Sequence, residues 1–303
     1  EKFMEFSYKD LLAQANCTAA FLLHQGIQKG DAIVVISSAS PFYFVLDLAL
    51  QYIGAVNISL PESTDTLRVG EIIKKHDAKY VFVEKPDIFL NYGQLTAYKS
   101  LVKGLVLCSE DVEDMDPDKL ITFESLVNRG KSAWREDAEG LRDRKDSVSL
   151  TDTYSLLYSQ VEDRYFLDKI TFEDLVRKVG EAEEIAETRK LGSIASVMAP
   201  YRLIFRTESL FAPMIRRSPV YLLPVEVMAP GVMNQITVTA LVADAKSIKE
   251  LYEMIPQKFM GQNSSAHRTL NAAAIIYKKL DAAKNEGKKP PIMVRIRYSW
   301  IQK

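Results

Sequence analysis

Residues 30–60 read GDAIVVISSASPFYFVLDLALQYIGAVNISL, and this stretch decides the fold. The continuous apolar run 32–36 is typical of a strand that is buried on both faces of a parallel sheet. Ser40 and Pro41 are start signals for a helix, because Ser caps a helix N-terminus and Pro suits its first turn. Residues 55–60 predict a second strand. The strand–helix–strand order indicates an α/β fold.

The same alternation continues on both sides of this stretch. Ser7 and Asp10 suit a capping box that starts a helix before it, with apolar residues recurring at helical spacing. A helix over 64–76 and strands over 80–83 and 101–107 are expected after it. The repeated alternation predicts a doubly wound fold with a mainly parallel sheet flanked by helices.

The remaining chain predicts a second lobe of the same kind. Residues 109–150 are densely charged and read as an exposed excursion that leads to it. We expect an N-terminal lobe over 1–146 and a second lobe over 147–303, with no mobile C-terminal domain. The second lobe is predicted to contain strands over 154–158, 194–198, 220–227, 235–242 and 292–298, and helices over 170–190, 207–216, 248–254 and 270–285.

Composition excludes several classes of protein. The 39 basic and 40 acidic residues give a net charge of −1, which argues against a nucleic-acid binder. No apolar run approaches the ~20 residues that a membrane-spanning helix needs. His24, His76 and His267 lie far apart and predict no metal site. Two cysteines in a chain of this size predict reduced thiols and a cytoplasmic location.

The N-terminal third resembles the large domain of the AMP-forming acyl-CoA synthetase superfamily, which includes fatty-acid CoA ligases and luciferases. The order and spacing of several short segments carry the resemblance, although each segment alone is weakly specific. The segments are Phe6 to Leu11, Ala19 to Leu22, Gly26 to Ile33, Ser40 to Phe44, Gly54 to Leu60 and Ile73 to Val83. The resemblance implies an ATP-dependent, Mg²⁺-assisted activation of a carboxylic acid.

The segment that corresponds to the family's ATP loop departs from the family pattern. That pattern is YTSGTTGxPKG, whereas no glycine occurs here between Tyr158 and Lys169. A phosphate-binding loop needs small residues so that backbone N–H groups can approach the anion. The resemblance implies nucleotide contacts from Tyr158, Ser159, Lys169 and, in place of the adenine-stacking tyrosine, Tyr298.

Two carboxylates stand in the same segment. Glu162 and Asp163 would face the phosphates of ATP. Like charges ~4 Å apart repel by about 4 kcal/mol at an effective dielectric constant of ~20. We therefore expect no useful ATP binding in the family's manner, no catalytic residue, and no cofactor.

A group of aromatic residues falls in the region that builds the acyl pocket in the family. These candidates are Tyr201, Phe205, Phe211 and Tyr221. Ordinary core packing is the competing interpretation. Arginines nearby suggest a contact with phosphopantetheine or an acidic carrier protein; these are Arg202, Arg206, Arg216 and Arg217.

The sequence thus predicts a degenerate acyl-CoA synthetase-like domain with a binding or regulatory role toward an acyl group, CoA, an acyl carrier protein or an active relative. One alternative is an acid-activating, AMP-forming ligase that uses ATP and Mg²⁺ and is completed by another chain. A structural subunit of a multienzyme complex is the third possibility, which self-association or a large apolar surface patch would favour; the partner is then another protein or a second copy of the chain.

Overall fold

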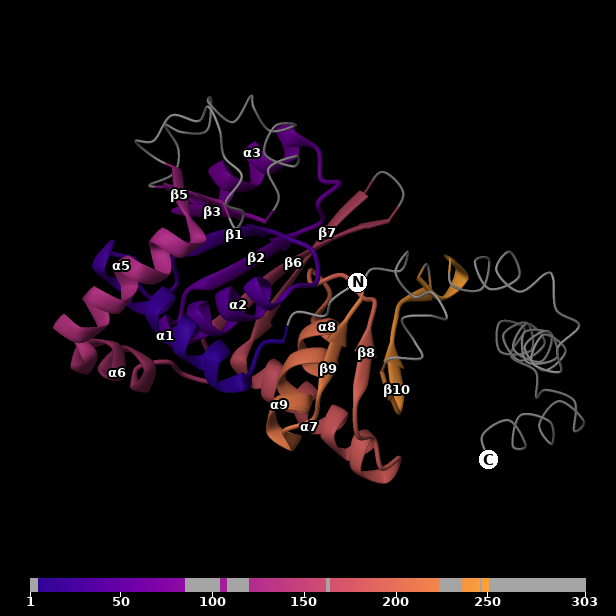
Figure 1. Ribbon diagram of the computed structural model, residues 1–303. Coiled ribbons are helices and arrows are strands. Elements are labelled where there is room, and N and C mark those ends of the chain that lie inside the picture. The colour runs from indigo at the N-terminus through magenta and orange to yellow at the C-terminus, as the bar shows by residue number, and fades with distance from the viewer. Residues whose placement is uncertain are drawn as a thin grey trace, which may run out of the picture. The chain divides into compact units, whose positions relative to one another are not determined.

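The structure is a computed structural model that describes residues 5–84, 104–107, 120–161, 164–223, 236–245 and 247–250. The chain divides into two units, Glu1–Asp244 and Ala245–Lys303. All of the strands and helices described below belong to the first unit (Figure 1).

A seven-stranded sheet forms the larger part of this unit, with the strand order β5-β4-β3-β1-β2-β6-β7. Strands β1 to β6 pair in parallel, and β7 runs antiparallel to β6. Five of them follow the order 2-1-3-4-5, a doubly wound arrangement. The strands are β1 Ala32–Ile36, β2 Val56–Leu60, β3 Tyr80–Val83, β4 Gly104–Leu107, β5 Leu120–Thr122, β6 Thr153–Val161 and β7 Arg164–Thr171.

The central strands are buried on both faces, as the apolar runs predict. Ile33 and Val35 of β1 pack in one hydrophobic cluster with helices α1 (Tyr8–His24) and α2 (Pro41–Ile53). Val34 and Ile36 pack in a second cluster with α3 (Thr66–His76). Figure 1 shows α3 on one side of the strands and α1 and α2 on the other. The doubly wound α/β prediction is confirmed.

Predicted helix starts coincide with side-chain caps. The Ser7 hydroxyl accepts a hydrogen bond from the N–H of Asp10, and the Ser40 hydroxyl accepts one from the N–H of Tyr43. Gly54 ends α2 in the left-handed conformation, with φ of 67°. That conformation favours glycine because it has no Cβ.

The described part of the predicted excursion, residues 120–150, is not a loop. It contains β5 and two helices, α5 (Phe123–Glu136) and α6 (Ala138–Asp146). Helix α5 packs on α1 so closely that a Cβ on Gly130 would lie 2.0 Å from the carbonyl oxygen of Cys17. The prediction failed because charged residues outnumber the few apolar positions that these helices bury.

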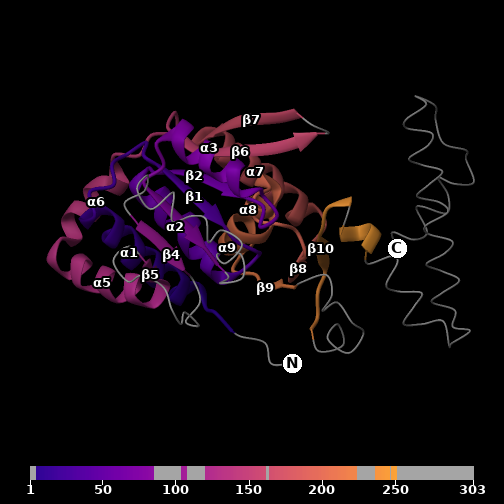
Figure 2. The same ribbon diagram turned by 90° about the horizontal axis from the view of Figure 1, so that it is seen from above.

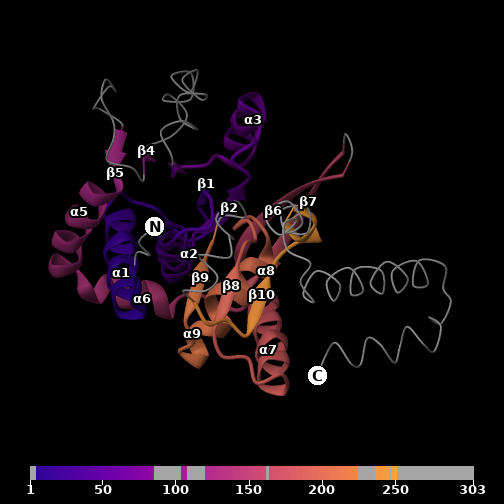
Figure 3. The same ribbon diagram turned by 45° about the vertical axis from the view of Figure 1, so that its right-hand side comes forward.

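A smaller parallel sheet follows, with the order β10-β8-β9. Figures 2 and 3 show it beside helices α7 to α9, and the π-helix η2 contacts both β8 and α7. Its elements are α7 Phe172–Thr188, β8 Ile194–Ser196, α8 Leu203–Arg206, η2 Thr207–Phe211, α9 Ala212–Arg216, β9 Val220–Leu222 and β10 Ala240–Val242. The lobe boundary after residue 146 stays a prediction, although β6 and β7, which follow it, complete the larger sheet.

Candidate functional site

The β6–β7 hairpin stands where the resemblance places the family's ATP loop. Described residues of the stretch after Tyr158 are strand residues: Ser159 pairs with Phe166, and Leu156 pairs with Lys169. These residues therefore do not form the loop that the resemblance implies. Backbone N–H groups committed to a strand ladder cannot wrap around an anion as those of a loop do.

The register brings two predicted nucleotide contacts to one face of the sheet. Tyr158 pairs with Leu167, so Lys169 is its diagonal neighbour across the hairpin. Lys169 is exposed. Tyr298, the predicted adenine contact, lies outside the described residues.

The side chain of Tyr158 packs against α3. Its hydroxyl forms a hydrogen bond of 2.6 Å with Nε2 of His76. The Arg68 guanidinium lies 5.8 Å and the Lys75 ammonium 5.9 Å from the ring centroid. Burial raises the pKa of Tyr158, while burial and the Lys75 charge lower the pKa of His76. Tyr158 thus anchors α3 to the sheet.

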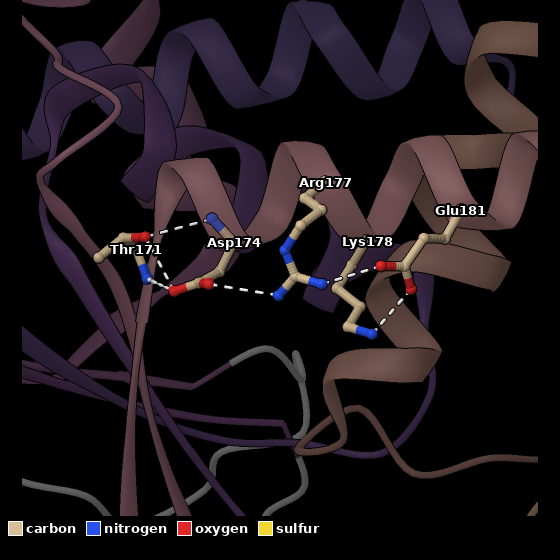
Figure 4. Close-up of polar contacts among 5 residues, drawn as sticks. All are labelled: Thr171, Asp174, Arg177, Lys178 and Glu181. Carbon is tan, nitrogen blue, oxygen red and sulfur yellow. Dashed lines mark hydrogen bonds and ion pairs between the residues drawn. The ribbon is translucent and has the colours of Figure 1, made fainter.

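The hairpin leads directly into α7, which begins with a capping box. Figure 4 shows the capping box: the Thr171 hydroxyl accepts from the N–H of Asp174 at 3.2 Å, and the Asp174 carboxylate accepts from the N–H of Thr171 at 3.1 Å. Arg177 then bridges Asp174 and Glu181. Hydrogen bonds from Thr171 lower the pKa of Asp174, so its carboxylate stays charged.

The first N–H groups of α7 all have partners within the chain. Those of Phe172 and Glu173 donate to the carbonyl oxygens of Asp152 and Leu150, at 3.1 and 2.9 Å. The next N–H, that of Asp174, donates to Thr171. A helix N-terminus binds phosphate through such free donors. Here these donors are taken, and a carboxylate already supplies the negative charge.

A second carboxylate fills the switch point of the larger sheet, where connections leave adjacent strands in opposite directions. Doubly wound folds bind ligands at this place, beside the carboxyl ends of the strands. Glu84 follows β3, and its Oε2 accepts from the Ser37 hydroxyl at 2.6 Å, the Ser38 N–H at 2.7 Å and the Ser38 hydroxyl at 2.8 Å. The donors at the carboxyl end of β1 thus hold a carboxylate of the chain itself, which follows β3.

The four acyl-pocket candidates do not share one environment. Phe205 is fully buried, and its ring lies 5.3 Å from that of Phe44, centroid to centroid. Phe211 belongs to the same hydrophobic cluster. Tyr201 and Tyr221 are half-buried. The structure thus brings Phe205 and Phe211 together in the core, while the acyl-pocket assignment stays a prediction.

One of the arginines proposed to face a partner is inside the protein. Arg206 has no exposed surface, so it cannot contact a carrier protein. Arg216 forms an ion pair of 2.6 Å with Glu183 of α7. Arg202 and Arg217 are exposed.

Arg206 belongs to a buried polar network that the sequence did not predict. Its Nη2 donates to the Ser59 hydroxyl at 2.8 Å, and its Nη1 lies 3.8 Å from Oδ1 of Asp47. Asp47 also accepts from the Asn57 amide at 2.7 Å and from the Tyr154 hydroxyl at 2.6 Å. The network therefore joins α2, β2, β6 and α8.

The network keeps two opposite charges away from water. Burial opposes the charge of Arg206, but Tyr154, Tyr43 and Asp47 outweigh it and raise the pKa of the guanidinium. The sequence signal that was missed is Asp47 in the otherwise apolar face of α2. A buried carboxylate needs a buried partner, and no pattern within one element identifies that partner.

Two kinds of site are absent from the described residues: a metal centre and a membrane-spanning helix. No group of three His, Cys, Asp or Glu residues is arranged to hold a metal ion there. No described helix has both the length and the apolar character needed to cross a membrane.

Comparisons with known proteins extend the sequence resemblance. The sequence model of the family described as "AMP-binding enzyme" matches residues 2–159, just over half of the chain. No curated protein matches the chain in sequence.

Solved structures share the fold at low sequence identity. Coronafacic acid ligase from Pectobacterium brasiliense has a TM-score of 0.67 at 15% identity over 86% of this chain and 49% of its own. MatB from Rhodopseudomonas palustris has a TM-score of 0.62 at 16% identity, over 82% of this chain and 46% of its own. MbtA from Mycobacterium smegmatis has a TM-score of 0.63 at 13% identity, over 84% of this chain and 46% of its own. The chain spans about half the length of these structures.

Proposed function

The chain belongs to the family of AMP-binding enzymes, and from this premise we propose that it is a non-catalytic member that binds an acyl compound without activating it. The observation that carries the proposal is the start of α7. Its first N–H donors are satisfied within the chain, and the Asp174 carboxylate already accepts from the backbone at the helix N-terminus, so these donors are not free to bind a phosphate.

ATP does not fit the groups that this chain offers. The segment after Tyr158 has no glycine before Gly180 and continues the strand ladder through Ser159. Electrostatics also oppose the anion, because a phosphate at the start of α7 would meet a carboxylate that hydrogen bonds keep charged. We therefore assign no catalytic residue and derive no adenylation step.

The ligand class rests on the family. We propose an acyl group, free or carried by CoA or an acyl carrier protein, in a reducing cytoplasm where Cys17 stays a thiol. The exposed Arg202 and Arg217 are the charged groups available to a phosphopantetheine or to an acidic carrier. Regulation of an active relative through the same surface is compatible with this role.

Thermal unfolding of the whole chain tests the proposal. Samples receive Mg-ATP, a series of free acids, a series of acyl-CoAs, or buffer. A ligand at 100 times its dissociation constant stabilises the folded state by about 2.7 kcal/mol. We expect a shift with at least one acyl compound and none with Mg-ATP. A shift with Mg-ATP, or ATP–pyrophosphate exchange by the chain alone, would overturn the proposal.

The competing proposal is an acid-activating ligase completed by a second polypeptide. It is favoured by fold neighbours that are described as ligases, among them coronafacic acid ligase. It predicts that pyrophosphate exchange arises when a candidate partner chain is added. If every such mixture is inactive while an acyl compound still stabilises the chain, the non-catalytic proposal holds.

A further inference from the structure

Strand β7 is the edge of the larger sheet, because β6 is its only neighbour among the described strands. Figures 1 and 3 show the β6–β7 hairpin extending away from the helices that cover the sheet. Two large apolar side chains are exposed on it: Phe166 at 48% and Leu167 at 39%. An edge strand with unpaired backbone groups and exposed apolar residues is a template for another strand.

The composition of β7 does not block such pairing. Residues 164–171 contain no proline, and the only irregularity in the β6–β7 register lies at the far end, between Thr153 and Ser155. Proteins commonly protect edges with bulges, prolines or charges. The charges here have both signs: Arg164, Asp168 and Lys169.

We propose that β7 pairs antiparallel with β7 of a second copy of this chain, forming a two-fold symmetric dimer. In such a pair, one residue of β7 stands opposite the same residue of the partner subunit, and the two-fold axis passes between the two. An axis between two adjacent residue pairs would make those pairs equivalent, whereas adjacent pairs in an antiparallel ladder differ in their hydrogen bonding. The choice of that residue fixes every other pair in the interface.

Charge complementarity selects Phe166 as the residue on the axis. Arg164 then stands opposite Asp168 of the partner subunit, and the symmetry repeats this pair. Tyr165 stands opposite Leu167 of the partner subunit. An axis at Asp168 would place two carboxylates together, and an axis at Leu167 would place Asp168 opposite an apolar ring. Opposite charges and apolar pairs directly across a ladder are stabilising, whereas like charges are destabilising.

The occupant is a second copy because the strand complements itself. A different partner would need to present its own edge with the reversed charge order, and nothing in the part of the chain that the structure describes specifies one. Pairing two sheets would also remove both exposed edges at once in a closed, isologous contact. The inference rests on β7 alone and not on the proposed ligand.

Sedimentation equilibrium of the full chain tests the dimer with a charge swap. Asp168→Arg or Arg164→Asp alone places like charges opposite each other twice, so each should raise the dimer dissociation constant by roughly tenfold or more. The double variant Arg164→Asp with Asp168→Arg restores opposite charges and should restore the dimer. Circular dichroism checks that each variant is folded.

Glu139→Arg is the matched control. It changes the net charge by the same amount as Asp168→Arg, at an exposed position of α6. Helix α6 lies away from the hairpin in all three views. It should leave the dimer unchanged. A monomeric wild-type chain would overturn the proposal, as would folded single variants that still dimerise with unchanged affinity. Failure of the folded double variant to regain the dimer would overturn the proposed register.

Discussion

Asp47 is a charged residue in an otherwise apolar helix, and residues distant in the sequence supply its hydrogen bonds and its counter-charge. Its side chain and that of Arg206 are both fully buried. Asn57 and Tyr154 donate to its oxygens, so the carboxylate has hydrogen bonds as well as a counter-charge. Removing one member of such a pair leaves the other charged in a medium of low dielectric constant.

The first prediction concerns this pair. Asp47→Leu and Arg206→Met should each lower the free energy of unfolding by about 3–5 kcal/mol, because each leaves an unpaired buried charge. The double variant should lose much less than the sum. Urea denaturation of the four proteins gives the coupling energy. A coupling near zero would show that the two charges do not stabilise each other.

The second prediction concerns the pH dependence of stability through His76. Burial and Lys75 lower its pKa below the ordinary value of 6.5. The unfolded chain therefore binds more protons just below pH 6.5, and stability falls as the pH drops from 6.5 through the lowered folded pKa. Urea midpoints measured between pH 8 and pH 5.5 should decrease in the wild type.

His76→Gln should make this decrease shallower and should cost about 1 kcal/mol at pH 8 through the lost bond to Tyr158. His24→Gln is the control, because His24 is exposed at the end of α1. It should retain the wild-type pH dependence. If the pH dependence of stability is unchanged in His76→Gln, His76 is not its cause.

At the scale of elements, we expect alanine substitutions at two helical glycines to change stability in opposite directions. Gly130 of α5 meets the backbone of α1, where a new Cβ would lie 2.0 Å from the Cys17 carbonyl oxygen. Gly130→Ala should therefore separate the helices and cost about 1–3 kcal/mol. A Cβ on Gly180 of α7 meets nothing within 4 Å. Gly180→Ala should stabilise the protein by up to about 1 kcal/mol.

Thermal and urea unfolding of both variants measure this contrast. The pair is informative because the same substitution is made in two helices, and only the surroundings differ. Equal effects of both substitutions would mean that helix propensity, and not the contact between α1 and α5, decides the outcome at Gly130.

How far the sequence predicts an element depends on whether the element's own residues specify it. The strand 32–36 and the helix from Pro41 were correct because their apolar runs and caps are local signals. Helices α5 and α6 were missed because their buried residues are few and their charges many. The hairpin was read as a loop by comparison with the family, although Tyr165, Phe166 and Ile170 favour a strand.

Some features of the candidate site can likewise be predicted from the sequence, and others cannot. The absence of glycine after Tyr158 and the Thr171 cap are visible in the sequence. The partners of the first α7 N–H groups are not, because Leu150 and Asp152 are reached only through the fold. The Arg206 network needs residues from four elements, so no local spacing predicts it.

At the scale of the whole molecule, the two sheets share one hydrophobic core. The cluster that contains Phe21 of α1 and Leu46 of α2 continues to Phe205, Leu210 and Phe211 beside the smaller sheet. The Arg206 network crosses the same region. Elements that share buried contacts lose them together, so the two sheets are expected to unfold in one cooperative step.

Two single-tryptophan proteins test this last prediction. Trp300→Phe leaves Trp134 of α5 as a reporter for the larger sheet. Trp134→Phe with Trp300→Phe and Tyr221→Trp places a reporter in β9 of the smaller sheet. Far-UV circular dichroism of each protein gives the urea midpoint of its overall unfolding, which accounts for any change in stability caused by the substitutions. In each protein the fluorescence midpoint of the reporter should coincide with this circular dichroism midpoint. Separate midpoints would show that the sheets are independent units, and the buried network would then be a contact between two domains.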